Sequence, residues 1–529
     1  MSNVPSTAIG DEFATMFADH GLPPVDPATS RDRGEGPYKR LVLRGATVID
    51  GTGAPPWGPA DLVVENGRIT VLKQVGTPHL PINPERRPAQ GDREIDCEGK
   101  FISPGFVDSH AHIGAPFHAA NGKMPPADYV YKLWLAHGVT TIREASCFNG
   151  LGWTLDQKAL SETHKIAAPN IQAYVAFPGT DDYVKTLHTP DEARAWVRAV
   201  QQRGADGVKF FGAPPALMRS ALEECKDVGL RSCCHHSQLA VSRMNMLTTA
   251  RWGLTSSEHS YGLPEVLLEG RTVQDFPAGY NYGDEYLRFS VAGETFLHAA
   301  KPGSDKWESV LQSFLDLGHT FVPTFNVYDA NRDLMRIRRA DWHARFTDST
   351  LWRYFQPQRG GHGAYFYRWS TGNEVDWRTS FRIWMDFVNE FKNRGGRVCT
   401  GSDSGFMYQI YGFGFIRELE LFQEAGFNPL EVLRAATASG AELMGLSDDV
   451  GTLEVGKRAD ILIHDSNPLE DFKLLYGSGT IRFNDDTSSV DWRRCLTQTI
   501  HGGVIYDTAQ LLADVEQMVA ATRTEGNVL

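Results

Sequence analysis

The chain has 529 residues, of which 41% are hydrophobic and 22% charged. This length exceeds one ordinary core and the composition is that of a globular protein, so we expect two or three structural units, or one large barrel with additions. The formal net charge of −13 argues against nucleic acid as a partner, because phosphate binding needs a concentrated basic face.

The first residues, the apolar runs and the cysteines indicate the cellular compartment. The first residues lack a basic stretch followed by an apolar one, so they do not predict a secretory signal. No apolar run approaches the roughly 18 residues that cross a bilayer, so we expect no membrane partner. The seven cysteines are scattered and odd in number. They disfavour a disulfide framework, and we predict a cytoplasmic protein.

Short strands follow an N-terminal extension over residues 1–39. From Arg40 onward, "LVLRGATVIDG", "DLVVENGRITVL" and "REIDCEGKFISP" are rich in Val, Ile and Leu, and Asn66-Gly67 is a strong two-residue hairpin signal. The connections are too short for crossover helices. Residues 40–101 therefore predict part of a small β module and not of a parallel sheet.

Longer alternation begins after Pro104. Helical segments such as residues 189–204, opened by Thr189-Pro190-Asp191 and closed by Gly204, alternate with apolar runs. Eight strand-like runs separated by helices predict a (β/α)8 barrel over residues 102–446. The runs are "GFVDSHAH", "GVTTIREA", "NIQAYVAF", "DGVKFFGA", "LRSCCHH", "LTSSEH", "HTFVPTFN" and "RVCTGSDS". Two long aromatic-rich spacers, at about 262–318 and 326–397, predict insertions at the barrel rim.

A β pattern returns near the C-terminus in "VGTLEVGKRADILIHD" and "QTIHGGVIYD". Residues 447–506 therefore complete a β module that both ends of the chain share, and residues 507–529 form a terminal helix and tail. The predicted fold class is α/β: a (β/α)8 TIM-type barrel with a small β-sandwich formed from both chain ends.

The stretch "GFVDSHAHIG" places His110 and His112 at the end of the first barrel strand. Positions i and i+2 of a strand face the same side, so both imidazoles point together at the end where barrel active sites are built. Two neutral imidazoles can bind one divalent metal, zinc above all. An isolated pair of this kind is more often structural, with one histidine in the core and the other facing a loop.

Other strand ends strengthen the metal interpretation. His235 and His236 end the fifth strand, His259 ends the sixth and Asp403 ends the eighth. Each is a ligand type that zinc accepts. Lys209 closes the fourth strand, where a buried ammonium is costly. A carbamate made from this lysine and carbon dioxide would be an anionic bridge between two metals.

With these pieces the sequence resembles the amidohydrolase superfamily of metal-dependent hydrolases, and most of all its imidazolonepropionase- and prolidase-like branch. The resemblance runs from about Arg40 to Tyr506. Its most specific segments are "ISPGFVDSHAH", "GVTTIRE", "SSEH", "TGSDSG" and "LRAATASGAELMGLSDDVGTLEVGKRADILIHDSNPLEDF".

The resemblance implies roles for these residues. His110 and His112, with Asp403, resemble the ligands of the more buried metal, and the fifth- and sixth-strand histidines those of the second metal. Lys209 resembles a carbamylated bridging lysine. Asp403 also resembles the acid/base group that moves a proton from the metal-bound water to the leaving group. The implied cofactors are two divalent ions, zinc first, with manganese, cobalt and iron as alternatives. A homo-oligomer is implied as well.

Two features depart from the family pattern. The fifth-strand ligand is doubled, and counting six residues from Gly229, as related sequences run, favours His235 over His236. The interval to His259 is also longer than usual, which predicts an altered loop after the fifth strand.

Three residues are candidates for substrate binding. Tyr261 and Tyr328, which follow the sixth and seventh strands, could donate to a substrate carbonyl, although aromatic residues in such places usually serve packing. Arg143 in "TTIRE" could pair with a substrate carboxylate, although a structural salt bridge with Glu144 or another acid is the commoner use.

The leading functional hypothesis is a binuclear hydrolase in which metal-bound hydroxide cleaves an amide of a dipeptide, an N-acyl amino acid or a cyclic amide. A single-metal deaminase is the second hypothesis. Such deaminases carry a glutamate shortly after the fifth-strand histidine and lack the lysine, whereas here Gln238 and Leu239 occupy those places and Lys209 is present. Ester, lactone and phosphotriester hydrolysis are further alternatives, and a non-catalytic scaffold relative is a remote one.

Overall fold

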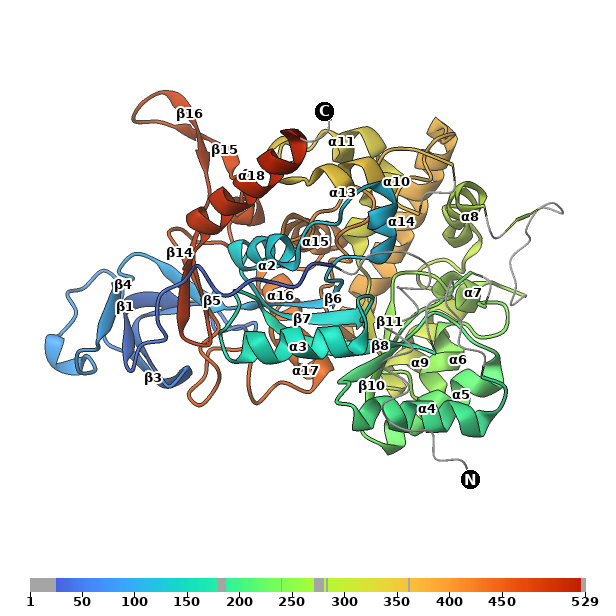
Figure 1. Cartoon of the computed structure of the whole chain (residues 1–529), viewed down its shortest axis with the longest axis horizontal. Coiled ribbons are helices and arrows are strands. Elements are labelled where there is room, and N and C mark those ends of the chain that lie inside the picture. Colours follow the sequence, from blue (N-terminus) through green and yellow to red (C-terminus); the bar gives the residue numbers. More distant parts are fainter. Residues whose placement is uncertain are drawn as a thin grey trace.

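Two large sheets divide the chain in this computed structural model (Figure 1), which describes residues 25–178, 187–238, 240–270, 280–281, 284–359 and 362–524. The first sheet holds the middle of the chain, and the second collects strands from both ends. Residues 1–24 of the predicted extension, and Leu239, lie outside the described residues.

The central sheet is parallel and eight-stranded, and each of the eight predicted runs supplies one strand. Backbone bonds from Ser109 N to Thr400 O (3.0 Å) and from Asp403 N to His110 O (2.8 Å) join the residues after the last strand to the first. The sheet thus fits the predicted TIM-like barrel. In spatial order its strands are β6 (Phe106–Ala111), β7 (Val139–Ser146), β8 (Asn170–Phe177), β9 (Gly207–Phe210), β10 (Arg231–His235), β11 (Ser256–Glu258), β12 (Thr320–Val322) and β13 (Arg397–Val398).

Helices connect these strands, and their ends follow local sequence signals. The predicted helix after residue 189 is α4 (Pro190–Gln202), where the Thr189 side chain accepts from Glu192 N and Glu192 accepts from Thr189 N. This capping box satisfies amides that the first helical turn leaves free. The others are α2 (Ala127–Ala136), α3 (Leu151–Glu162), α5 (Pro215–Asp227), α6 (Met246–Arg251), α9 (Asp305–Asp316), α14 (Thr371–Asn393), α15 (Phe413–Ala425), α16 (Pro429–Ala435) and α17 (Ala438–Met444).

The two predicted insertions carry additional short helices. Their aromatic residues are largely buried: the Tyr328 ring stacks on Trp377, with ring centroids 5.7 Å apart, and Phe289 stacks on Tyr365 at 4.0 Å. These contacts fasten the insertions to the barrel. The short helices are α7 (Leu263–Leu267), α8 (Glu285–Ala292), α10 (Asp329–Arg332), α11 (Leu334–Arg338), α12 (His343–Phe346) and α13 (Ser349–Tyr354).

The second sheet places strands from both chain ends side by side. Asn66-Gly67 forms the predicted turn, with Glu65 opposite Arg68. The prediction that these strands do not pair in parallel was wrong, because the first strand pairs in parallel with the fourth and fifth. The chain segment between these strands is long enough to connect them without a crossover helix. The strands are β1 (Leu41–Val48), β2 (Trp57–Glu65), β3 (Arg68–Gln74), β4 (Arg93–Asp96), β5 (Phe101–Pro104), β14 (Ile461–His464), β17 (Leu496–His501) and β18 (Val504–Asp507).

The end sheet and the barrel are fastened together by buried polar contacts. Thr499 donates from its hydroxyl to Leu135 O at 2.7 Å. The terminal helix α18 (Thr508–Thr524) packs on α2, where Lys132 Nζ lies 2.9 Å from an Asp514 carboxylate oxygen. In the described ranges no helix is both long and apolar enough to cross a bilayer. All seven cysteines are buried, and none of them forms a disulfide.

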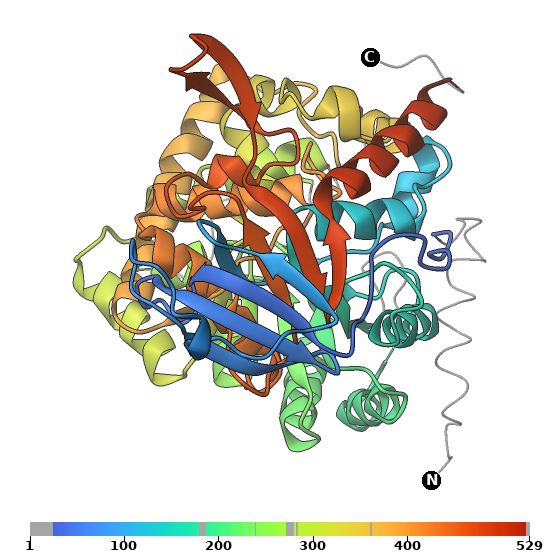
Figure 2. The same ribbon diagram turned by 90° about the vertical axis from the view of Figure 1, so that its left-hand side faces the viewer.

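One hairpin stands apart from both sheets. Strands β15 (Thr480–Asn484) and β16 (Ser489–Arg493) pair only with each other and project from the body (Figures 1 and 2). We call residues 480–493 the arm.

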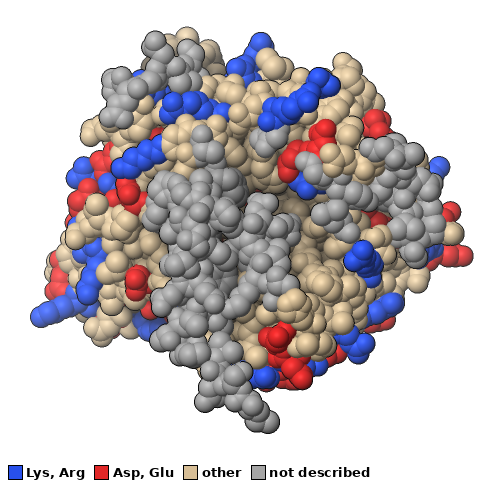
Figure 3. All heavy atoms as spheres, turned by 45° about the vertical axis from the view of Figure 1, so that its right-hand side comes forward, with Lys and Arg blue, Asp and Glu red and all other residues tan. Residues whose placement is uncertain are grey.

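Charges of both signs lie on the face shown in Figure 3. On the described part of this face, lysine and arginine side chains are interspersed with aspartate and glutamate along the two flanks.

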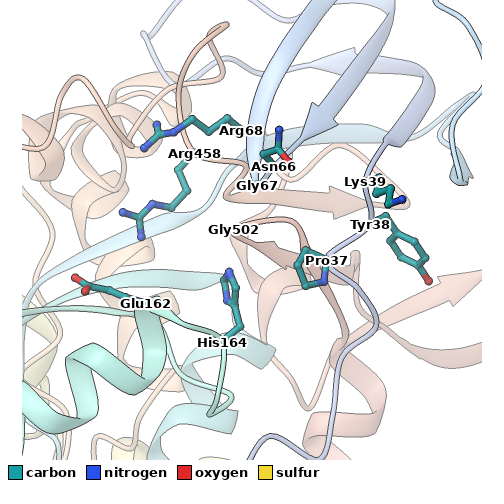
Figure 4. A pocket seen from close by; sticks show the side chains of 10 residues that line it. All are labelled: Pro37, Tyr38, Lys39, Asn66, Gly67, Arg68, Glu162, His164, Arg458 and Gly502. Atoms are coloured by element: carbon teal, nitrogen blue, oxygen red, sulfur yellow. The ribbon is translucent and has the colours of Figure 1, made fainter.

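A cavity of about 520 Å³ opens between the end sheet and α3 (Figure 4). Its walls carry Arg68, Arg458, His164 and Glu162, and both arginines pair with Asp449. None of the predicted site residues lines this cavity, so the candidate chemistry lies elsewhere, at the barrel mouth.

Candidate metal centre

The candidate metal-binding motif begins on β6, whose six residues are all buried. His110 lies on this strand and His112 follows its end, and their ring centroids are 5.3 Å apart. Two positions before His110, the Asp108 carboxylate accepts from Ser402 N (2.8 Å) and Ser402 Oγ (2.5 Å). Asp108 thus holds the segment after β13 in place, and His110 and His112, on the same side of the chain, direct their imidazoles toward that segment.

Asp403 completes a compact set of ligand atoms. One ligand atom each of His110, His112 and Asp403 lies within 4.8 Å of the others. Asp403 Oδ1 is 3.1 Å from His112 Nε2 and 3.6 Å from His110 Nε2. Ligands bound at about 2.0–2.2 Å to a tetrahedral ion lie roughly 3.3–3.6 Å apart. The residues present therefore fit a divalent metal.

The ligand-type residues of the cluster differ in their protonation preferences. Burial lowers the pKa of His110 well below its ordinary value, which keeps the ring neutral, as a ligand must be. Burial works to lower the pKa of His112 as well, but Asp403 and Glu144 outweigh it and raise that pKa, so a metal ion would compete with a proton for this ring. Burial works to raise the pKa of Asp403, but His110 and His112 outweigh it and lower that pKa to about 2. A carboxylate and two imidazoles are donor types that zinc accepts.

Lys209 points into the same cluster from β9. Its Nζ lies 3.3 Å from His110 Nε2 and 5.2 Å from the centre of the Phe211 ring, and the residue is 1% exposed. Within the described ranges no carboxylate oxygen lies within the 4.0 Å of an ion pair from this Nζ. The Lys209 ammonium can donate to His110 Nε2, but a buried ammonium without a carboxylate partner is costly, and a carbamate would remove that positive charge.

The fifth- and sixth-strand histidines extend the cluster on its other side. His259 Nε2 lies 3.8 Å from Asp403 Oδ2, and its Nδ1 bonds the Thr324 hydroxyl at 2.6 Å. The His235 ring lies against His259 with centroids 4.6 Å apart. His236 points away from the cluster, and its Nε2 bonds the Thr249 hydroxyl at 2.7 Å. The geometry therefore favours His235 as the ligand.

Substitutions of His235 and His236 should affect metal content differently. His235→Asn removes a ligand, so we expect metal content to fall and metal affinity to drop at least roughly tenfold. His236→Asn, the matched control, keeps a polar group for Thr249 and should leave metal content unchanged. Metal analysis by mass spectrometry measures both variants. The reverse result, with metal lost only from His236→Asn, would exchange the two roles.

Glu258 is a site residue that the sequence did not reveal. Its Oε2 lies 2.5 Å from His110 Nδ1, which fixes the ring so that Nε2 faces Asp403. Arg143 donates from Nη2 to both Glu258 oxygens at 2.8 Å, and its other nitrogens donate to Ser256 and Ser109. Such contacts orient metal ligands. Arg143 is fully buried, and this geometry favours a salt bridge with an acid over contact with a substrate.

Glu258 was missed because strand alternation sends neighbours to opposite faces. His259 has φ of +62°, and Asp403 has φ of +45°. These left-handed conformations are uncommon outside glycine and cluster at functional sites. The turn at His259 lets Glu258 and His259 reach the same cluster. The available signal was the acid in "SSEH" directly before a predicted ligand.

The two candidate tyrosines lie beside the second pair of histidines. The Tyr328 ring is 5.7 Å from the His259 ring, and the Tyr261 ring is 5.4 Å from the His235 ring. The tyrosines also meet edge to face at 5.7 Å. Both are therefore placed at the cluster, on the side opposite His112.

Phenylalanines contact the cluster on both sides. The Phe148 ring lies 4.7 Å from the His112 ring, and Phe406 lies 5.9 Å from it. Phe211 lies 5.8 Å from the His235 ring. The cluster thus sits among apolar walls, which strengthen electrostatic interactions inside it.

Known proteins match parts of this chain. The sequence profile of the amidohydrolase family matches residues 384–503. An adenine deaminase from Bacillus pumilus is 31% identical over 102 residues, covering 19% of this chain and 14% of that protein. A dihydropyrimidinase from Rattus norvegicus is 28% identical over 261 residues, covering 45% and 44%. The solved structure of a bottromycin amidohydrolase superposes with a TM-score of 0.62 at 17% identity, covering 99% of this chain and 94% of the other.

The matched segments span less than half of these two sequence relatives, whereas the structural match extends over nearly the whole chain and shows the shared fold. The profile match includes the motif "TGSDSG" at residues 400–405. Residues 384–503 of this chain therefore match the amidohydrolase family, and the chain as a whole shares the fold of an amidohydrolase structure.

Proposed function

We propose that this protein is a metal-dependent hydrolase that cleaves the C–N bond of an amide, in a dipeptide, an N-acyl amino acid or a cyclic amide. The observation that carries the proposal is the buried cluster of His110, His112 and Asp403 at the catalytic end of the barrel, with ligand atoms within 4.8 Å of one another. The matches to a dihydropyrimidinase and to an amidohydrolase structure support the choice of an amide.

The proposed enzyme binds two divalent ions. His110, His112 and Asp403 would hold the first, and His235 and His259 the second, with a carbamate on Lys209 between them. Lys209 supports this division because its Nζ already lies 3.3 Å from His110 Nε2. Zinc fits the nitrogen-rich set best, and manganese, cobalt and iron are the alternatives.

The residues of the chain suggest how the reaction proceeds. When bound, the metals supply an activated water and polarise the amide carbonyl. Asp403, which is held anionic, takes a proton from the attacking water and delivers it to the amide nitrogen as the C–N bond breaks. Tyr261 and Tyr328 would donate to the carbonyl oxygen. Water and amide are consumed, and a carboxylic acid and an amine leave.

A single-metal aminohydrolase is the competing proposal, because the match to an adenine deaminase favours it. Against it stand Lys209 in the cluster and Gln238, where such deaminases carry an acid. Three further proposals accompany the amide hydrolase: a cytoplasmic location, which seven buried cysteines without a disulfide support; a sandwich form for the end sheet; and a homo-oligomer.

The test is a screen of dipeptides, N-acyl amino acids and cyclic amides with the purified, metal-loaded enzyme. We expect release of a carboxylic acid and an amine from at least one class, loss of at least roughly 99% of the rate after chelation, and recovery on adding zinc. Free ammonia from an aminopurine, with no amide cleaved, would transfer the assignment to deamination. No turnover of any class by fully metal-loaded protein would contradict the hydrolase.

A further inference from the structure

The arm carries an apolar face that nothing else in the described chain covers. Ile481 lies opposite Trp492 in the ladder, and Phe483 lies opposite Val490. Positions that alternate along each strand share one side of a ribbon, so these four side chains form a single face. The exposed fractions of these side chains are 55% for Ile481, 57% for Trp492, 63% for Phe483 and 59% for Val490.

The polarity of the arm is inverted. Its other face is polar, and most of it is better covered: Thr480, Arg482, Asn484 and Asp491 are intermediate in burial, whereas Ser489 and Arg493 are exposed. Arg482 pairs with Asp471 of the body. A monomer would turn the apolar face inward and the polar face to water. This ribbon does the reverse, which is typical of a surface that meets another molecule.

An isolated ribbon also needs a partner for its own stability. A two-stranded hairpin is marginally stable in water, and both of its strands are edges. The arm pairs with no third strand, and it projects from the body in two perpendicular views (Figures 1 and 2). A second ribbon packed on its apolar face would supply the missing third and fourth strands of a small core.

The charges at the two ends of the arm identify the partner. Asp485 and Asp486 lie in the exposed loop at its tip, and Arg493 lies at its base, where it is 3.5 Å from Asp491 of the same arm and keeps 57% of its side chain exposed. Two copies related by a two-fold axis, with their ribbons antiparallel, bring the acidic tip of each beside the basic base of the other. A two-fold contact requires a self-complementary patch of this kind.

The exposed apolar area of the arm is large enough for a contact between two copies. The four half-exposed side chains offer on the order of 500 Å² per copy, so a pair of arms reaches roughly the 1,000 Å² that a biological interface needs. An anionic bilayer fits less well, because the acidic tip would be pushed away from it.

We propose that the arm is a dimerisation element, which packs its Ile481, Phe483, Val490 and Trp492 face on the same face of a second copy. The inference does not depend on the proposed activity, because no residue of the metal cluster belongs to the arm.

Sedimentation velocity over a range of micromolar concentrations tests the proposal. We expect the wild type to sediment as a dimer. The double variant Phe483→Ser/Trp492→Ser should dissociate, with its dimer dissociation constant raised at least roughly a hundredfold. Leu80→Ser and Val455→Ser remove residues that are 63% and 62% exposed but lie outside the arm, and should remain dimeric. Thermal melting and metal content show whether each variant is folded.

Charge reversal tests the antiparallel arrangement. Arg493→Asp alone should weaken the dimer, and adding Asp485→Arg and Asp486→Arg should restore it, because the attraction is then rebuilt with opposite signs. A monomeric wild type, or a dimer that the double serine variant leaves intact, would overturn the proposal. So would wild-type protein that floats with vesicles of phosphatidylcholine and phosphatidylserine and loses this binding in the arm variant, since that result assigns the face to lipid.

Discussion

Replacing Asp403 by asparagine is expected to lower the rate of amide hydrolysis by at least roughly a hundredfold, and as much as ten-thousandfold, because the site loses its proton carrier. The carboxylate lies 3.1 Å from His112 Nε2, and its pKa is lowered to about 2. An amide at the same position has similar size and can still ligate a metal through its oxygen, but it cannot accept a proton.

The measurement separates proton transfer from metal loss. We expect Asp403→Asn to retain most of its metal while kcat falls and KM changes little, because substrate contacts remain. Asp465→Asn, at an exposed residue outside the cluster with 52% of its side chain accessible, is the control and should match the wild type. A metal-loaded Asp403→Asn enzyme that kept its activity within about tenfold would remove Asp403 from the role of general base.

Replacing Lys209 by alanine is expected to reduce metal content from about two ions per chain to about one or fewer, and to abolish most of the activity. The lysine is buried, has His110 Nε2 at 3.3 Å, and ends the strand that faces both proposed metals. Without it the second ion loses its bridge, while His110, His112 and Asp403 remain in place for the first.

Mass spectrometry of protein purified without chelator measures the metal content. Lys132→Ala is the matched control, since Lys132 is also buried but pairs with Asp514 at 2.9 Å. Its loss should lower thermal stability and leave metal content unchanged. About one metal in both wild type and Lys209→Ala would show that Lys209 is not a bridge. The single-metal aminohydrolase would then be the better proposal.

The sequence specified much of the barrel because each strand has its own signal. The eight apolar runs became eight parallel strands, and the Thr189 and Asn66-Gly67 signals formed the expected helix start and turn. Each of these signals depends on residues within a few positions of one another. Local sequence is therefore sufficient to predict them.

Part of the metal cluster was predictable from the order of the strands. His110 and His112 share a strand, and parallel strands all end at one mouth, so placing Asp403 and His259 with them followed from topology alone. The choice between His235 and His236 did not follow. It required the contact of His236 with Thr249, which comes from a helix after the strand.

Contacts between distant parts of the chain decided the remaining features of the site, the end sheet and the arm. The link from Arg143 through Glu258 to His110 joins three different strands, and no spacing within one segment predicts it. The parallel pairing of β1 with β4 and β5 depends on the path that the chain takes between them. The apolar face of the arm became evident only from its exposure. Sequence by itself indicated which residues of metal-ligand type lie at the strand ends, because side-chain chemistry and strand periodicity are local. Tertiary structure decided which residues orient them and which apolar surface is left uncovered, because both depend on what the distant parts of the chain bring into contact.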